Sequence, residues 1–298
     1  MYDVDLFDVA SSTFDEVKAK GSAVICYFSA GTQEDWRDDA DDFPEEALGE
    51  PLGDWEGEVW VDVNNEGVRA VMTSRLDLAA EKGCDGVEPD NVQASIIMHG
   101  SATGVNVTAD QQADYSIFLA TEAHKRNLSI GLKNDLEHLV DLEPFFDWAI
   151  NESCFEYEEC DLYASTFLTA GKAVFSSEYE WSDLSFCAEA NAMGLSSLLK
   201  SYELGPERCS CQDPSSNNQC VLLLEEGEVP APSGSSSSST SSESGPPAQA
   251  PVVQTPTPSI VETVEPASGA RRRFSVGSEG MWVAVVAGTV TAVAAAYA

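Results

Sequence analysis

Three carboxylates crowd six positions in the segment CDGVEPDN, residues 84–91: Asp85, Glu88 and Asp90. The segment comes after a stretch with helical periodicity. Its own composition is that of a buried strand with charge at its end. Two carboxyl groups in different environments can act as acid and base, because burial and neighbouring charges move their pKa values apart. This segment is therefore the first candidate for a catalytic centre.

Polar residues, and one glycine, also follow the other apolar segments, at the point where each segment ends. They are Ser29, Gly31, Asp62, Asp85 to Asn91, Lys133, Asn134, Asp135, Asn151, Glu152, Glu178 and Tyr179. In a barrel of parallel strands these ends converge on one mouth, where the loops build the active site. Helix capping could explain a single carboxylate such as Asp135, but it does not explain so many clusters.

The residue types at this predicted mouth favour a glycosidase. Carboxylates dominate it, and aromatic rings on which sugars can stack lie nearby in the sequence. These rings are Tyr27, Phe28, Trp36, Trp55, Trp60, Trp148, Tyr157 and Tyr179. The sequence has no G-x-S-x-G motif, and its three histidines lack the spacing of a metal site, so we expect no metal and no cofactor.

A repeated order of helix, glycine and apolar strand surrounds these residues. Segments 13–16 and 108–111 have the form of capping boxes, and a helix predicted over residues 66–82 ends at Gly83. With YDVDLFD, EVWVDV and FFDWAINES, about eight strands can be counted, which predicts an α/β fold, a (β/α)8 TIM barrel. The alternative is an open doubly wound sheet, but the Gly-rich phosphate loop expected of that fold is absent.

Composition divides the chain into three parts. We predict a catalytic domain over residues 1–222, a disordered Ser/Thr/Pro-rich linker and spacer over 223–280, and a hydrophobic tail over 281–298. The chain has 51 Asp and Glu against 15 Lys and Arg, a net charge of −36. This charge argues against a nucleic-acid partner and for a cationic or neutral one, unless the acidity serves only solubility.

The C-terminal segment indicates a membrane anchor, whereas the N-terminal segment lacks the pattern of a secretion signal. The tail MWVAVVAGTVTAVAAAYA is uncharged and follows a polar spacer and the small residues Ser268, Gly269 and Ala270, as in a GPI-attachment signal. A single transmembrane helix is the alternative. The start, MYDVDLFDVASS, is not a signal peptide. We therefore expect an extracellular, membrane-anchored protein whose N-terminal segment is missing from this sequence.

All eight cysteines precede the Ser-rich segment, and an even number fits disulfides in a secreted protein. Cys154 and Cys160 are close enough in sequence to close a short loop. Cys209, Cys211 and Cys220 are expected to staple the end of the domain, with Cys187 as a candidate fourth member. Cys26 and Cys84 lie in apolar segments and are interpreted as buried thiols.

Five longer strings carry a resemblance to a known family: ICYFSAG, RLDLAAEKGCDGVEPDN, AHKRNLSIGLKND, FFDWAINESCFEYEEC and AGKAVFSSEY. In this order they closely resemble glycoside hydrolase family 114, the endo-α-1,4-polygalactosaminidases, from about Tyr2 to about Cys220. The resemblance implies a (β/α)8 barrel that cuts α-1,4-linked galactosamine within the chain by a retaining mechanism. The expected partner is a cationic polysaccharide, and the protein is expected to be a monomer.

The same resemblance implies roles for individual residues. Asp90 would be the nucleophile and Glu152 the acid/base. The resemblance does not fix the other roles. Around this pair we expect the substrate-binding residues Tyr27, Asp62, Asp85, Glu88, Asn91, Lys133, Asn134, Asp135, Glu178 and Tyr179. Lys133 beside the carboxylates would favour the ionised nucleophile, although a purely structural ion pair is an equal alternative.

The sequence departs from the family pattern at the rim of the site. Residues 92–95 read VQAS where the family tends to continue with Asp-Gly-Tyr, and Ser153 replaces a glutamine. These changes leave the preferred sugar open. Two other functions remain: a catalytically silent polysaccharide-binding protein at the cell surface, and a hydrolase of another α-linked glycan.

Overall fold

The computed structural model describes residues 1–53, 55–94, 103–179, 181, 183–202 and 208–212. It also describes the backbone of four short strands between residues 261 and 294. The predicted linker and the loop IIMHGSATG lie almost wholly outside these described residues.

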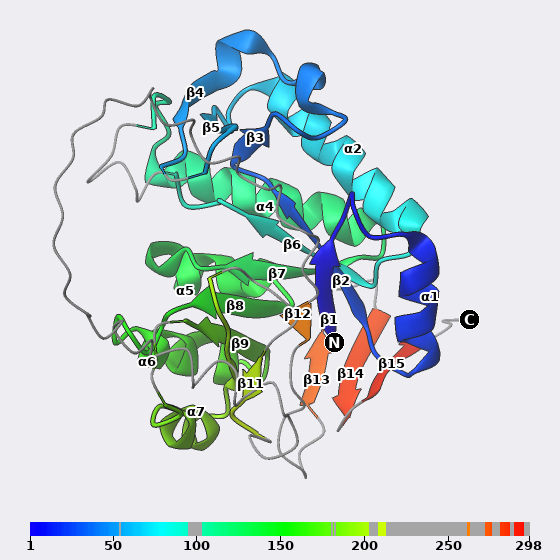
Figure 1. Cartoon of the computed structure of the whole chain (residues 1–298), viewed down its shortest axis with the longest axis vertical. Helices are drawn as coiled ribbons and strands as arrows, with labels where there is room; N and C mark the ends of the chain where they lie inside the picture. The colour runs from blue at the N-terminus through cyan, green and yellow to red at the C-terminus, as the bar shows by residue number, and fades with distance from the viewer. Residues whose placement is uncertain are drawn as a thin grey trace, which may run out of the picture.

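A curved, mostly parallel sheet forms the centre of the molecule (Figure 1). Its parallel strands are β1 (Tyr2–Asp5), β2 (Val24–Ser29), β6 (Gly86–Asp90), β7 (Ser129–Lys133), β8 (Trp148–Glu152), β9 (Ala173–Glu178) and β10 (Ser196–Leu199). Two antiparallel strands flank them, β11 (Cys209–Ser210) beside β10 and β12 (Val261–Glu262) beside β1. This curled sheet with its helices is a (β/α)8-type fold, as the sequence predicts.

Helices follow most of the parallel strands and pack against them. They are α1 (Ser11–Ala19), α2 (Glu66–Lys82), α4 (Ala109–Lys125), α5 (Leu139–Leu142), α6 (Cys160–Tyr163) and α7 (Cys187–Met193), with short helical turns at Ala40–Asp42, Glu45–Ala47, Leu136–His138, Glu143–Phe145 and Ala164–Leu168. Helix α4 contacts both β6 and β7, and α2 contacts β6.

The predicted helix ends are confirmed in two cases and wrong in one. The capping box of α4 is present at Thr108 and Gln111. Helix α2 ends at Gly83, whose φ of 86° is the left-handed conformation that glycine adopts without strain. The capping box expected at 13–16 is wrong, because α1 already begins at Ser11 and no side chain caps it.

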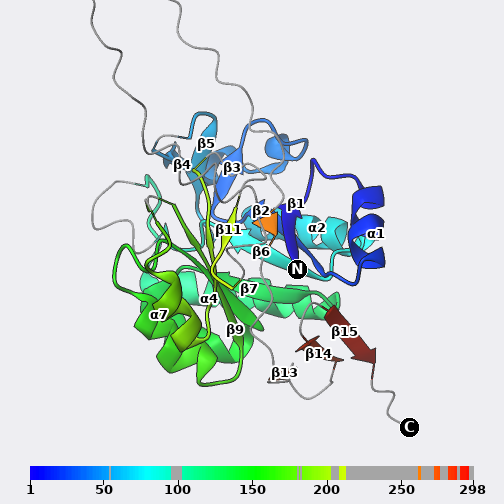
Figure 2. The same ribbon diagram turned by 60° about the horizontal axis from the view of Figure 1, so that its bottom comes forward.

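A small antiparallel sheet corrects the predicted strand count. EVWVDV forms β5 (Glu58–Val61), which lies between β3 (Thr32–Glu34) and β4 (Leu48–Pro51) and not in the parallel sheet. Between β2 and β5 the described chain contains β3, β4 and two short helical turns, and no longer helix that could serve as the crossover typical of parallel pairing. Figure 2 shows β3, β4 and β5 grouped at one end of the molecule.

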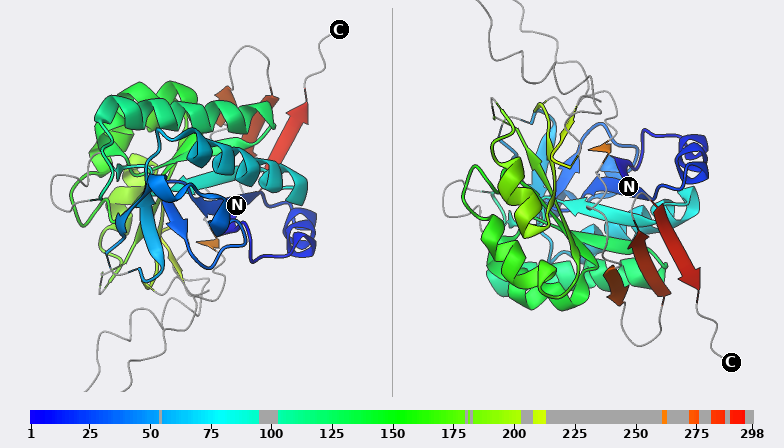
Figure 3. Two further views of the ribbon diagram at one scale, coloured as in Figure 1. Left: turned by 90° about the horizontal axis from the view of Figure 1, so that it is seen from above. Right: turned by 90° about the horizontal axis from the view of Figure 1, so that it is seen from below.

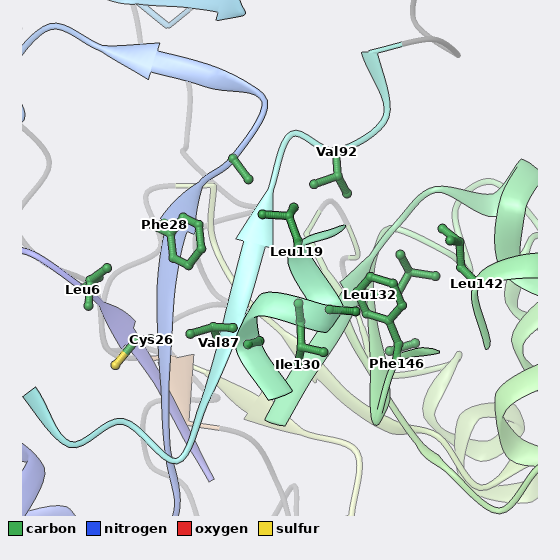
Figure 4. Close-up of a cluster of buried hydrophobic side chains, with 14 of the residues drawn as sticks. Leu6, Cys26, Phe28, Val87, Val92, Leu119, Ile130, Leu132, Leu142 and Phe146 are labelled. Atoms are coloured by element: carbon green, nitrogen blue, oxygen red, sulfur yellow. The ribbon is translucent and has the colours of Figure 1, made fainter. Parts of the chain in front are cut away.

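Apolar side chains bury both faces of the parallel sheet. Phe28, Val87, Leu119 and Ile130 belong to the main core between strands and helices (Figure 4). A smaller cluster on the other face contains Ile25, Trp148, Ile150 and Phe175. Since successive strand residues point to opposite faces, this second cluster lies on the concave side, below the polar strand ends.

Three disulfides are present among the described residues, with sequence separations of 6, 24 and 58. The short loop between Cys154 and Cys160 is closed as predicted, and Cys187 pairs with Cys211. The interpretation of Cys26 and Cys84 as thiols is wrong, because they form a disulfide between β2 and the start of the CDGVEPDN segment. This bond ties together two neighbouring strands of the parallel sheet.

The described parts of the spacer and the tail form a separate antiparallel sheet of β13 (Arg272–Ser275), β14 (Met281–Val286) and β15 (Thr289–Ala294), seen in Figure 3. Among the described residues, no helix has the length and hydrophobicity needed to cross a membrane. The membrane-anchor hypothesis stays a prediction.

Candidate active site

Lys133, the last residue of β7, lies at the centre of a cluster of carboxylates. Its Nζ is 2.9 Å from Oε1 of Glu88, 3.2 Å from Oδ1 of Asp90 and 3.1 Å from Oε2 of Glu152. The strands β6, β7 and β8 are neighbours in the sheet, so their carboxyl ends bring these four side chains together. The three carboxylates raise the pKa of Lys133 although burial opposes its charge, and the side chain is therefore an ammonium.

Asp90 ends β6 and is held on several sides. The backbone amides of Ala30 and Gly31 donate to its carbonyl oxygen at 2.8 and 3.2 Å, and the Tyr27 hydroxyl donates to its Oδ2 at 3.2 Å. Only 16% of the Asp90 side chain is exposed. This burial, with smaller contributions from Glu152 and Glu88, raises its pKa against the opposing effect of Lys133.

A buried polar group next to Asp90 includes Glu58, which the sequence analysis missed. Asn91 has a φ of 60°, and its Nδ2 donates to Oγ of Ser29 at 3.0 Å and to Oε1 of Glu58 at 3.2 Å. The Thr32 hydroxyl donates to the same Glu58 oxygen. Burial raises the pKa of Glu58 to about 7. The sequence predicted EVWVDV as a strand of the barrel, and that placement gives no reason to expect Glu58 beside Asp90.

The chain also approaches itself closely behind Asn91. A Cβ built on Gly31 would lie 1.7 Å from the carbonyl oxygen of Asn91, so no other residue fits there without moving the backbone. The predicted position of Gly31 at a strand end thus reflects close packing of β2 against the end of β6.

Glu152 ends β8 and has more solvent around it, with 36% of its side chain exposed. The Tyr179 hydroxyl donates to its Oε1 at 2.7 Å, and its backbone amide donates to Oδ1 of Asn134 at 3.0 Å. Burial opposes ionisation, but Lys133, Tyr179 and Asn134 together outweigh it and lower the pKa of Glu152. Burial raises the pKa of Tyr179, so its hydroxyl keeps the proton that it donates.

Asp3 of β1 is a second carboxyl group that the sequence analysis did not single out. It is buried beside Glu88, and burial together with the charge of Glu88 raises its pKa well above the usual range. A protonated Asp3 limits the negative charge that Lys133 must balance. The segment YDVD holds two aspartates in four residues, so its sequence alone does not mark Asp3 as buried.

Four predicted substrate-binding residues bind groups other than Lys133, Asp90 and Glu152. The expectation for Asp85 is wrong, because it precedes β6, accepts from the amide of Val24 and pairs with Lys18 at the opposite end of the sheet. Asp62 accepts from Asn64 just before α2.

The other two stabilise neighbouring chain segments. Asp135 pairs with His138 at 2.7 Å and is buried. Oε1 of Glu178 accepts from the amide of Phe155, in the loop that follows Glu152, and burial raises its pKa to about 7.

Five of the remaining predicted residues contact Asp90, Glu152 or each other: Tyr27, Glu88, Lys133, Asn134 and Tyr179. The sixth, Asn91, follows Asp90 and donates to Ser29 and Glu58. Among the described residues, Cys154, Cys160 and Glu178 form the one group with atoms close enough to hold a metal ion. Its two cysteines are joined in a disulfide, so their sulfurs are not thiolate ligands.

The cluster has the geometry of a pair of carboxyl groups that act on one bond. Oδ1 of Asp90 and Oε2 of Glu152 each lie within 3.2 Å of the same nitrogen, so these two oxygens are separated by less than twice that distance. Retaining glycosidases hold their carboxyl groups roughly 5 Å apart, and inverting enzymes separate them by about 6.5 Å or more. The upper limit on the distance between these two oxygens is compatible with the retaining spacing.

The chain is similar to several known proteins. A sequence model described as glycoside-hydrolase family GH114 matches residues 1–216. Among solved structures, Aspergillus fumigatus Ega3 in complex with galactosamine is 39% identical with a TM-score of 0.59, over 67% of this chain and 82% of that chain.

A second solved structure, the glycoside hydrolase domain of PelA from Pseudomonas aeruginosa, is 13% identical with a TM-score of 0.51, over 67% of this chain and 86% of that one. At this identity it shows the fold alone. No curated protein matches the chain.

Proposed function

The chain belongs to glycoside-hydrolase family GH114, and from this premise we propose that it is a retaining, endo-acting hydrolase of α-1,4-linked galactosamine polymers. Ega3, which is 39% identical, was crystallised with galactosamine. That ligand supports galactosamine as the sugar unit of the proposed substrate. The net charge of −36 is complementary to a polymer whose unacetylated amines are protonated near neutral pH.

The observation that carries the proposal is the shared contact of Asp90 and Glu152 with Lys133. Two carboxyl groups at such a separation can reach the two sides of one glycosidic bond. In the first step an oxygen of Asp90 attacks the anomeric carbon, while Glu152 gives its proton to the departing glycosidic oxygen. In the second step Glu152 takes a proton from water, whose oxygen attacks the anomeric carbon and releases Asp90.

Exposure supports this division of roles. Glu152 is the more exposed of the two, with 36% of its side chain open against 16% for Asp90. An acid/base group must meet both the leaving sugar and the incoming water, whereas a nucleophile contacts only the anomeric carbon. Lys133 and the Tyr27 hydroxyl stabilise Asp90 when it carries charge.

The free site has pKa values in the opposite order, with that of Asp90 raised and that of Glu152 lowered. Burial raises the pKa of Asp90, whereas Lys133, Tyr179 and Asn134 outweigh burial and lower that of Glu152. Two carboxyl groups this close titrate as a pair, so the position of one proton depends on what is bound. A substrate ammonium on the carbon next to the anomeric centre would favour charge on Asp90 and leave the proton on Glu152.

The test is hydrolysis of a panel of α-linked polymers, with and without N-acetylation. We expect the mean chain length of deacetylated α-1,4-galactosaminan to fall before monosaccharide accumulates, as in endo cleavage. Binding of that polymer without any cleavage would instead support the silent binding protein. Cleavage of a different α-linked glycan alone would support a hydrolase of another sugar.

A further inference from the structure

Two tyrosines stack at the edge of the candidate active site, beside Glu152. Tyr179 follows β9 and Tyr202 follows β10, and their ring centroids are 4.8 Å apart with planes inclined by 15°. Strands β9 and β10 are adjacent and in register, with Glu178 opposite Leu199. Both rings therefore lie at the same carboxyl edge of the sheet as Lys133 and Glu152.

A hydrogen bond to Glu152 orients the first ring of the stack. Tyr179 donates from its hydroxyl to Oε1 of Glu152 at 2.7 Å, which sets the direction of its ring. Tyr202 then lies parallel to a ring that cannot turn freely. Yet 58% of Tyr202 is exposed, more than most large apolar residues of the described chain.

An exposed aromatic ring on its own is common at protein surfaces and needs no explanation. Tyr202 differs because it combines exposure with a fixed orientation next to a carboxyl group that acts on the glycosidic oxygen. A sugar ring carries a face of C–H groups, and an aromatic ring attracts both such a face and a nearby cation. An aminosugar supplies both.

We propose that Tyr202, oriented by Tyr179, is the stacking platform of a subsite for the aminosugar on the leaving-group side of the bond. This inference rests on the proposed function, in which Glu152 protonates the leaving group. The sugar beyond the cleaved bond must lie on the Glu152 side of Lys133, where Tyr202 is exposed. The platform favours binding of oligomers over the monosaccharide, because it contacts a sugar other than the one attacked.

The experiment measures binding of α-1,4-galactosamine oligomers in a Glu152→Gln background, which prevents turnover. Tyr202→Ala should weaken binding of an oligomer that spans the cleavage point about tenfold, the loss of one well-placed stacking and cation–π contact. Galactosamine monosaccharide should bind equally to both proteins. Tyr202→Phe keeps the ring and should bind the oligomer as the background protein does.

Phe145→Ala is the matched control, since Phe145 is also exposed but precedes β8, at the opposite end of the sheet. It should leave oligomer binding unchanged. Equal oligomer binding with and without the Tyr202 ring would overturn the subsite while the hydrolase stands. A loss of oligomer binding in Tyr202→Ala that is matched by a loss of monosaccharide binding and a lower Tm would also overturn it. Failure of every oligomer to bind the background protein would overturn the proposed substrate, and the subsite with it.

Discussion

Asp90 and Glu152 share one lysine, but the protein supports them in different ways. On the Asp90 side, backbone amides of Ala30 and Gly31 hold the carbonyl, and a buried group that includes Glu58 holds the next residue. On the Glu152 side the contacts are side chains of loop residues, Tyr179 and Asn134, and the carboxyl group reaches solvent. The first arrangement suits a group that must not move. The second suits one that exchanges protons with a leaving group and with water.

Removing either carboxyl group should have the largest effect. Asp90→Asn and Glu152→Gln keep the shape but lose the nucleophile and the proton donor, so each should lower kcat/KM on polymer by about a thousandfold or more. The two sides should differ when the leaving group needs no proton. An aryl oligogalactosaminide with an acidic phenol should restore formation of the glycosyl-enzyme in Glu152→Gln and not in Asp90→Asn. Equal recovery in both variants would remove the distinction between the two sides.

Lys133 joins the two sides, and its loss should affect both. Lys133→Met leaves Glu88, Asp90 and Glu152 close together without their cation, so kcat/KM should fall by about a hundredfold and the free energy of unfolding by about 3 kcal/mol. Polymer assays and urea denaturation measure the two effects. Lys125→Met, which breaks an exposed ion pair with Glu122, is the control and should change stability by less than about 1 kcal/mol. A fully active Lys133→Met would show that the lysine has no part in the reaction.

The two tyrosine hydroxyls should shift different limbs of the pH profile. Each stabilises the charged form of its carboxyl partner, so Tyr27→Phe should raise the pKa of Asp90 further and Tyr179→Phe should raise that of Glu152. In the substrate complex, where Asp90 is charged and Glu152 holds the proton, we expect the acid limb of kcat to move to higher pH in the first variant and the alkaline limb of kcat to do so in the second, each with about a tenfold loss of activity. Movement of the same limb in both variants would contradict the separate roles.

Glu58 should affect stability more than catalysis. Its pKa of about 7 lies above that of an unfolded glutamate, so the folded state holds the proton more tightly and loses stability as the pH rises from about 4.5 to about 7. Glu58→Gln should remove roughly 3 kcal/mol of this decline, measured by denaturation across that range. Glu81→Gln, at an exposed position of α2, is the control and should retain the decline. An unchanged slope in Glu58→Gln would show that Glu58 is ionised throughout.

The sequence predicted the parallel sheet and the polar ends of its strands for a physical reason, whereas the choice of Asp90 and Glu152 as the catalytic pair came from the family resemblance. Buried strands and their polar ends are local patterns, and Asp90, Lys133 and Glu152 each end such a strand. Asp85 was misplaced because a strand boundary shifted by a few residues moves a side chain to the other end of the sheet. Glu58 was missed because antiparallel pairing of β3 with β5 depends on contacts between segments that no local pattern reveals.

The most direct test of the central assignment is the anomeric configuration of the product formed with azide. With an aryl oligo-α-galactosaminide, Glu152→Ala should form the glycosyl-enzyme, and azide should attack it to give the α-glycosyl azide, with retention. Asp90→Ala should lack the nucleophile, and azide should replace it to give the β-glycosyl azide, with inversion. Nuclear magnetic resonance of the two products distinguishes them. The α-azide from the Asp90 variant and the β-azide from the Glu152 variant would show that the two roles are exchanged.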